Sequence, residues 1–330
     1  MTATPELQAA SAPSVPEPRF RISRYRRLAW IGSGLACLLS LIGLVVSWLN
    51  PQIHSPLKPG LDFTGGTQIQ IERQCPIGSC SPIAGPDVQR RLAALALPED
   101  GGDAAPNISS AAVQVLDQGQ SMVLRLPALR PAQATAVIQD LNEAFGPLNQ
   151  AGTAVDTIGP TLGAQLLQGS VISLVVSFAA IAAYITFRYD RIFAFLALVT
   201  LGHDVLITCG LFAWLGLLQG IEVDSLFAVS LITVAGYSVT DTVVVFDRIR
   251  EQKTALADLP VTEQVDVAVN ATLTRSLYTS LTTVLPLLGL IFFGGSSLFW
   301  FAIALTTGIV VGSWSSIGVA PTLLPLLARR

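Results

Sequence analysis

Two aspartates inside apolar runs are the residues of this sequence best placed to do chemistry. Asp204 lies 12 residues into the run Ile192–Leu218, and Asp241 lies in the run Leu226–Phe246. A helix needs about 20 apolar residues to cross a bilayer, so both runs are long enough. Asp204 is then expected about 18 Å along its helix, past the middle of a hydrocarbon core about 30 Å thick. A carboxylate at that depth is costly unless it has a partner or a task.

A buried carboxylic acid has the chemistry of a proton carrier. In a low-dielectric medium its neutral form is favoured, so it can load from one side and release the proton when it is hydrated or approached by a cation. Thr200 and Thr208 flank Asp204 and predict a narrow polar face on its helix. His203 is expected to point about 100° away from Asp204 and is a weak candidate. The alternative is a hydrogen-bonded carboxylate that only locks helices together.

Charged residues crowd the end of the helix that carries Asp241. Asp247 and Arg248 directly follow Phe246 and, with Asp241, predict a second cluster near the cytoplasmic end. Proton relay and a structural role are both open for Asp241, whereas an ion-pair latch or a partner contact is favoured for Asp247 and Arg248. Arg248 lies two turns, about 10 Å, from Asp241 and is expected to pair with a carboxylate on another helix or on a partner.

The elements that must position these residues are membrane helices. The chain has 330 residues, of which 51% are hydrophobic and 12% are charged, against about 25% charged residues in average soluble proteins. The short connections 218–225 and 294–297 hold no Lys or Arg, so the positive-inside rule places both termini in the cytoplasm. The six predicted transmembrane helices cover Trp30–Leu49, Leu166–Phe187, Ile192–Leu218, Leu226–Phe246, Ser276–Phe293 and Leu298–Leu327, the last with a tilt or kink at Pro321.

The predicted organisation is one helix, an outside domain and five further helices. Its parts are a disordered cytoplasmic tail with a basic end (1–27), transmembrane helix 1 (28–50), an extracytoplasmic α+β domain (51–165) and a five-helix transmembrane domain (166–330) with a cytoplasmic link (247–275). In the outside domain the hydrophobic patterns follow the order β-α-β-β-α-β, the ferredoxin-like arrangement. In the link, residues 262–270 predict an interfacial helix.

Two motifs stand out along the chain. Residues 60–67 read GLDFTGGT, and residues 235–251 read AGYSVTDTVVVFDRIRE. Both resemble the SecF family, a branch of the SecD/SecF proteins in the RND superfamily, with Thr240 where the family more often has Asn. The matching residues include Asp62, Thr64, Gly65, Gly66, Thr67, Gly236, Tyr237, Ser238 and Asp241. The glycines of the first motif are expected to permit a tight turn into the first strand, and the motif lacks the G-x-x-x-x-G-K-[ST] pattern of a phosphate loop.

The resemblance implies a subunit of the protein-secretion machinery of the bacterial inner membrane. Such a subunit would form a heteromer with SecD and work with the SecYEG channel, downstream of SecA. It would use the proton gradient to help draw a translocating polypeptide outward, and the family's membrane-embedded acidic residues are implicated in proton movement. The resemblance implies no cofactor and no enzymatic reaction. Two rivals are an RND-type exporter of small molecules or lipids, and a translocon scaffold that transports nothing.

Cys75 and Cys80 are expected to form a disulfide. They flank the segment PIGS, whose Pro and Gly allow the turn that would bring them together, and the outside compartment permits oxidation. Two cysteines without a nearby histidine make only half of a zinc site, so no metal site is predicted. Cys37 and Cys209 lie in membrane runs and are expected to be packing residues.

Mass spectrometry of the unreduced protein should therefore find the peptide that holds Cys75 and Cys80 lighter than the dithiol by the mass of two hydrogen atoms. A sample reduced before alkylation is the control, in which both cysteines take up the label. Quantitative labelling of both thiols without reductant would contradict the bond.

Overall fold

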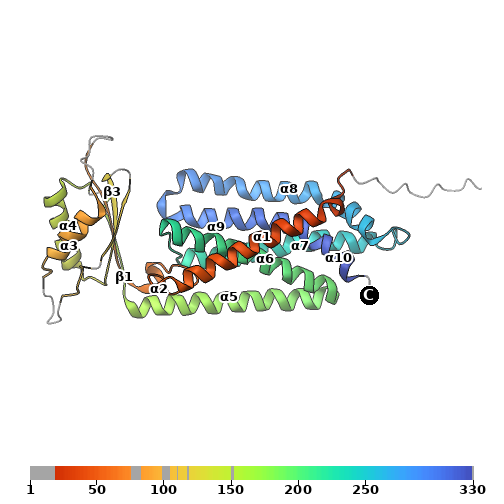
Figure 1. Cartoon of the computed structure of the whole chain (residues 1–330), viewed down its shortest axis with the longest axis horizontal. Coiled ribbons are helices and arrows are strands. Elements are labelled where there is room, and N and C mark those ends of the chain that lie inside the picture. The colour runs from red at the N-terminus through yellow and green to blue at the C-terminus, as the bar shows by residue number, and fades with distance from the viewer. Residues whose placement is uncertain are drawn as a thin grey trace, which may run out of the picture. The chain divides into compact units, whose positions relative to one another are not determined.

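The structure is a computed structural model that describes residues 19–75, 83–98, 105–109, 111–116, 119–149 and 152–328 (Figure 1). It divides into two compact units. The helical unit is built on residues up to Leu57, on Leu174–Ile221 and on residues from Leu226 onward. The sheet unit contains Lys58–Ser173 and the short segment Glu222–Ser225.

Six helices of the described residues are long and apolar enough to cross a membrane, as predicted. The sixth span is composite, because a π-helical turn joins two α-helices. The long helices α1, α6, α8 and α9 run lengthwise in Figure 1. The spans are α1 (Ile22–Leu49), α5 (Pro160–Arg188), α6 (Arg191–Gln219), α7 (Ser225–Gln252), α8 (Val261–Phe293) and the series α9 (Gly295–Trp314), η3 (Ser315–Val319) and α10 (Ala320–Leu327).

The π-helical turn η3 sits where the sequence predicts a kink. Pro321 has no N–H to donate to the preceding turn, and its ring crowds that turn. The helix there widens into η3 instead of bending at the proline alone. All five residues of η3 are buried. Its side chains therefore face other helices and not lipid.

The predicted interfacial helix over residues 262–270 is wrong as a separate element. Helix α8 runs without a break from Val261 into the fifth span. The apolar face that suggested a membrane surface packs on protein instead: Val265, Ala268 and Val269 are fully buried in the core of the helical unit. Nothing between Val261 and Pro286 breaks the helix, so the part of the link from Val261 onward and the fifth span form one continuous helix.

The sheet unit follows the predicted β-α-β-β-α-β order. Its elements are β1 (Gly66–Glu72), α3 (Gly85–Ala94), β2 (Ala112–Leu116), β3 (Ser121–Leu126), α4 (Pro131–Phe145) and β4 (Ala154–Ile158). The strand order is β2-β3-β1-β4, and every neighbouring pair is antiparallel. Figure 1 shows α3 and α4 together on one face. The core there is made by Ile69, Ile71, Met122 and Leu124 from the sheet and Val88, Leu92, Val137 and Leu141 from the helices.

The motif GLDFTGGT makes the tight entry into β1. It forms the short helix α2 (Leu61–Thr64) and then two glycines with positive φ, +70° at Gly65 and +126° at Gly66. A Cβ on Gly66 would lie 2.7 Å from the carbonyl oxygen of Leu126. Thr67, the next residue, is fully buried, and its hydroxyl accepts the N–H of Leu129 at 2.8 Å. The predicted turn is therefore present, and glycine is required for both conformation and space.

Gly66→Ala should destabilise the sheet unit more than Gly146→Ala. Both glycines have positive φ, so both substitutions strain the backbone by about 1 kcal/mol, but a Cβ on Gly146 meets nothing within 4 Å. The extra loss at Gly66 comes from the clash with a main-chain carbonyl, which cannot rotate away. Protease resistance of the purified protein in detergent measures the difference. Equal resistance of the two variants would contradict this account of the motif.

Candidate functional site

Asp204 lies on α6 where that helix meets α7 and η3. Its side chain is fully buried. Oδ2 accepts hydrogen bonds from Ser238 Oγ at 2.5 Å and from Ser315 Oγ at 2.8 Å. Oδ1 lies 2.8 Å from His203 Nδ1.

One expectation about the neighbours of Asp204 is wrong. His203 does not point away, because rotation about its side-chain bonds brings the imidazole back to the adjacent carboxylate. The hydroxyl of Thr200 donates to the Leu196 carbonyl at 3.0 Å, and that of Thr208 donates to the Asp204 carbonyl at 2.8 Å. Threonines inside helices commonly bond main-chain carbonyls in this way. The donors to the carboxylate therefore come from other elements and from His203.

Asp241 on α7 is the second buried carboxylate, and its residue is 7% exposed. Its Oδ2 accepts a hydrogen bond from Ser316 Oγ at 2.5 Å. Ser315 and Ser316 are consecutive in η3, so one π-helical turn donates to both Asp204 and Asp241. Turns of this kind are frequent at functional sites. The sequence predicted the two aspartates separately, and the structure joins them through adjacent hydroxyls.

The signature stretch supplies hydroxyl groups on two sides of α7. Ser238 is the donor to Asp204, and Tyr237 donates from its hydroxyl to Ser280 Oγ on α8 at 2.9 Å. Gly236 and Thr240 are exposed, and the Thr240 hydroxyl donates to the Gly236 carbonyl at 2.8 Å. The Thr240 side chain therefore bonds only within α7 among the described residues, and it does not bond either buried carboxylate.

The cytoplasm-facing end expected for α7 carries a separate cluster around Asp247. Tyr189 donates a hydrogen bond to Asp247, and Arg250 approaches the same carboxylate at 3.8 Å. The guanidinium groups of Arg188 and Arg250 lie 5.1 and 5.8 Å from the centre of the Tyr189 ring. Burial, and then the charge of Asp247, raise the pKa of Tyr189 to about 12. The phenol therefore keeps its proton and acts as a donor.

Within the described chain Arg248 pairs on its own helix and not with a carboxylate on another helix, and its expected contact with a partner stays a prediction. Its Nη1 lies 3.2 Å from Oε2 of Glu251, one turn along the same helix. Both side chains are largely exposed, so the pair contributes little stability. Asp241 bonds Ser316, and Asp247 bonds Tyr189. Asp241, Asp247 and Arg248 therefore have separate partners within the described residues and do not form the expected cluster.

Within the sheet unit, the motif loop holds the connection between α6 and α7. Asp62 Oδ2 accepts the N–H of Ser225 at 3.0 Å and also the Ser225 hydroxyl. Ser225 is the first residue of α7, so Asp62 satisfies one of the N–H groups that a helix leaves open at its start. Main-chain bonds join the same segments, from Gly60 N to Val223 O at 2.8 Å and from Val223 N to Lys58 O at 2.9 Å.

Glu222 adds an ionic contact to this connection. Its carboxylate is shared by Lys58, at 3.4 Å, and by Arg125 of β3. Burial lowers the pKa of the Arg125 guanidinium, and burial together with the charge of Arg125 lowers the pKa of Lys58. We name the contacts of Lys58, Asp62 and Arg125 with Glu222 and Ser225 the loop clasp.

Sequence reasoning missed a third buried carboxylate, Asp266 on α8, which is 2% exposed. It accepts the N–H of Ser23 at 2.9 Å and the Ser23 hydroxyl at 2.5 Å, and thereby caps α1 from another helix. Asp266 lies between Val265 and Val267 in a stretch that is otherwise polar. A carboxylate in a polar stretch is normally expected to be exposed, so the sequence did not predict its burial. Ser315 and Ser316 were missed because serines in an apolar run are read as packing residues.

The cysteines divide as expected in part. Cys75 is disulfide-bonded, and Cys37 and Cys209 are free. Cys80 lies outside the described residues, so its pairing with Cys75 stays a prediction. No group of three or more His, Cys, Asp or Glu side chains among the described residues could hold a metal ion.

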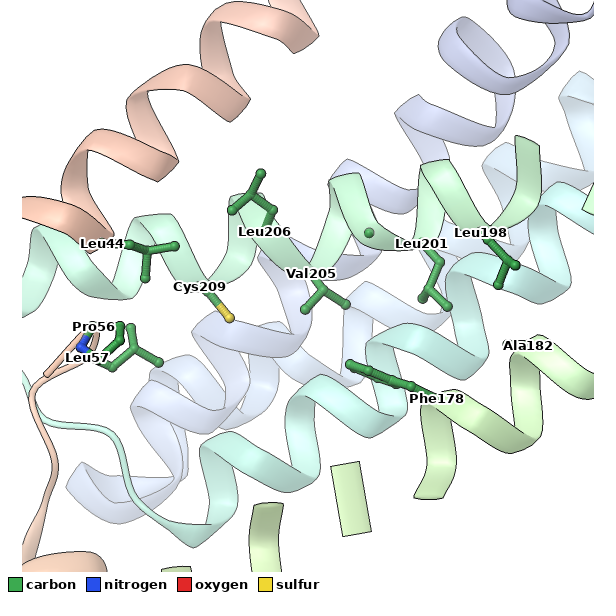
Figure 2. Close-up of a pocket in the computed structure, with 11 residues that line it drawn as sticks. Leu44, Pro56, Leu57, Phe178, Ala182, Leu198, Leu201, Val205, Leu206 and Cys209 are labelled. Atoms are coloured by element: carbon green, nitrogen blue, oxygen red, sulfur yellow. The ribbon is translucent and has the colours of Figure 1, made fainter. Parts of the chain in front are cut away.

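An apolar pocket of about 560 Å³ lies beside α6 in the helical unit (Figure 2). Figure 2 shows Phe178 of α5 facing Leu201 and Val205 of α6, with Cys209 further along that helix. The carboxylate of Asp204 does not line this pocket. The residues that line the pocket suit it to apolar groups, and none of them is charged.

Two family models match this chain. Residues 137–330 match "Protein export membrane protein SecD/SecF, C-terminal", and residues 53–77 match "SecD/SecF GG Motif". The protein translocase subunit SecF of Prochlorococcus marinus is 50% identical over 307 residues, which cover 93% of this chain and 95% of that protein. The corresponding subunit of a Synechocystis species is 41% identical over 302 residues, or 91% of each chain.

A solved structure has the same fold. The crystal structure of SecDF from Thermus thermophilus, described as a translocon-associated membrane protein, is 29% identical with a TM-score of 0.76. The match covers 95% of this chain and 39% of the SecDF chain, so this chain spans well under half of that protein. SecDF in a super-membrane-facing form gives a TM-score of 0.61. From the family models and the extent of these matches, the chain belongs to the SecF family of SecD/SecF protein-export membrane proteins.

Proposed function

We propose that this multi-pass membrane protein assists the export of polypeptides as a SecF-type translocase subunit driven by the proton gradient. It acts in the bacterial inner membrane with both termini in the cytoplasm. Its relatives in Prochlorococcus and Synechocystis are named as protein translocase subunits, which supports the export role. The reaction is transport and needs neither a cofactor nor covalent chemistry.

SecD is the proposed partner of this chain. A Thermus thermophilus relative named SecDF matches it over 82% of this chain but only 34% of its own length, so that protein carries a large additional part. We infer that a separate SecD chain supplies the corresponding part here. The SecYEG channel would deliver the polypeptide, with SecA acting before the subunit on the cytoplasmic side.

The observation that carries the proton role is the environment of Asp204. A fully buried carboxylate held by two serine hydroxyls and one imidazole has no arginine or lysine partner among its hydrogen-bond donors in the described chain. Without a permanent cation, its neutral and ionised forms both remain accessible. Ser238 of α7 and Ser315 of η3 both donate hydrogen bonds to the carboxylate. When the carboxylate gains or loses a proton, the strength of these two hydrogen bonds changes. Protonation is thereby linked to how α6, α7 and η3 pack.

We propose that α7 is the helix that moves when Asp204 gains or loses a proton. It carries Ser238 and Asp241 and begins at Ser225, about 20 Å from Ser238 along the axis. The loop clasp bonds the first turn of α7 and the residue Glu222 just before it. A shift of α7 would therefore displace the segment Glu222–Ser225, which belongs to the sheet unit. One proton that crosses 100 mV releases about 2.3 kcal/mol, enough to exchange a few hydrogen bonds of about 1 kcal/mol each.

Asp204→Asn should largely abolish assisted export while the protein still folds and binds SecD. The amide keeps the size of the side chain and its capacity to bond hydroxyls, but it cannot carry a proton. The measurement is secretion from cells in which the variant is the sole copy, with membrane level and SecD co-purification as controls. Near-normal export at a normal protein level would exclude the relay and leave the scaffold role.

Reversal of charge in the loop clasp should lower export, and a second reversal should restore it. Glu222→Arg places three cations together, and Arg125→Glu places two carboxylates together, so each variant repels where the chain now attracts. The double variant restores opposite charges. Export is compared at matched membrane levels. Full export by both single variants, or no recovery in the double variant, would contradict a coupling role for the clasp.

A further inference from the structure

His203 forms a pair with Asp204 and leaves one ring nitrogen without a partner. Its Nδ1 bonds the carboxylate at 2.8 Å. The imidazole side chain is only 9% exposed, yet Nε2 has no hydrogen-bond partner among the described residues. A buried polar nitrogen without a hydrogen-bond partner destabilises the folded protein. A function for Nε2 would account for a histidine at this position.

The enclosure of Asp204 restricts how a proton can reach it. The carboxylate has no exposed surface, and the side chains that donate to it are Ser238, Ser315 and His203. Serine hydroxyls do not hold a net charge near neutral pH. Imidazole is the side chain that takes up and releases a proton between about pH 5 and 8. Of the three groups, His203 alone can store the proton on its way to the carboxylate.

We propose that His203 is the group through which Asp204 exchanges its proton, with Nε2 as the entry atom. The proposal rests on the proton-coupled function and names the path to that site. Nε2 is itself buried in the described chain, so a proton reaches it only when a water molecule or an acidic group of a partner subunit enters beside the ring. His203 contacts the carboxylate directly and serves as a relay, not as a structural brace.

The transfer balances in two steps. A hydronium ion gives its proton to Nε2, and water leaves as the ring becomes imidazolium. The Nδ1 proton then passes along the 2.8 Å hydrogen bond to Oδ1, which yields a neutral acid and a neutral ring with the proton on Nε2. In the reverse direction Asp204 first returns its proton to Nδ1, which makes the ring imidazolium, and Nε2 then gives its proton to water. No electrons are transferred and no other reactant is needed.

Two further titratable groups are connected to the pair, one through its charge and one through a neighbouring serine. Cys37 on α1 lies within the electrostatic reach of Asp204. Asp241 is held by Ser316, the neighbour of the serine that bonds Asp204. Neither group bonds Nε2 of His203 among the described residues, so we expect both to act on the pair through their charge. The pH dependence of exchange should therefore follow His203.

The test uses the complex with SecD in sealed vesicles and measures the proton uptake that an imposed gradient drives. The measurement is repeated at external pH values from about 5 to 8. In His203→Asn an amide can still donate to Asp204 from the position of Nδ1, but it cannot titrate. Uptake should fall by about 100-fold or more, the lower end of what a positioned acid–base group contributes, and the residual rate should lose its step near neutral pH. Asp204→Asn in parallel should lose uptake altogether.

The outcomes separate this inference from the proposed function. Wild-type rate and pH profile in His203→Asn, with uptake lost in Asp204→Asn, would overturn the histidine path and leave the proton role standing. Unchanged uptake in both variants would overturn the proposed function itself. If His203→Asn fails to assemble, nitrogen NMR of labelled imidazole in the unaltered site decides. The chain has two histidines, so a His54→Gln background isolates His203. An Nε2 that does not change protonation between about pH 5 and 8 would refute the proposal.

Discussion

The helical unit depends on the solvation of one buried carboxylate. A charge that leaves water must regain its hydrogen bonds from protein, or the protein loses several kcal/mol. Asp204 regains them from three directions, through Ser238 on α7, Ser315 on η3 and His203 on its own helix. This requirement explains why the signature stretch carries a serine at 238. It also explains why the sixth span contains a π-helical turn, which directs two adjacent serines at two aspartates.

Helix α7 connects the separate parts of this arrangement. Its first residue is capped by Asp62, its middle carries Ser238 and Asp241, and its last turns hold Asp247 against Tyr189. Each of these contacts uses an acidic or hydroxyl group, and each joins α7 to a different segment of the chain. The two sequence motifs thus act on one element: the first motif holds the start of α7, and the second forms its body.

Most of the fold could be predicted from the sequence, but the partners within the site could not. Apolar runs and alternating strands carry strong periodic signals, so the six spans and the order of the sheet followed from them. The burial of residues 262–270 did not, since an apolar stripe looks the same facing lipid or protein. Ser315 and Ser316 carry no signal in an apolar run, because their role depends on tertiary contacts. The contact of His203 with Asp204 depends on a rotamer that spacing does not specify.

The proposed function requires that Asp204 changes its protonation state in the working protein. Infrared difference spectroscopy of the complex with SecD in lipid detects this directly, through the carbonyl stretch of a protonated carboxyl group that shifts in deuterated water. We expect such a band to appear and disappear when a proton gradient is imposed and removed, and to be absent in Asp204→Asn. A spectrum in which no carboxyl group sensitive to Asp204→Asn changes its protonation under the gradient would contradict the proton role.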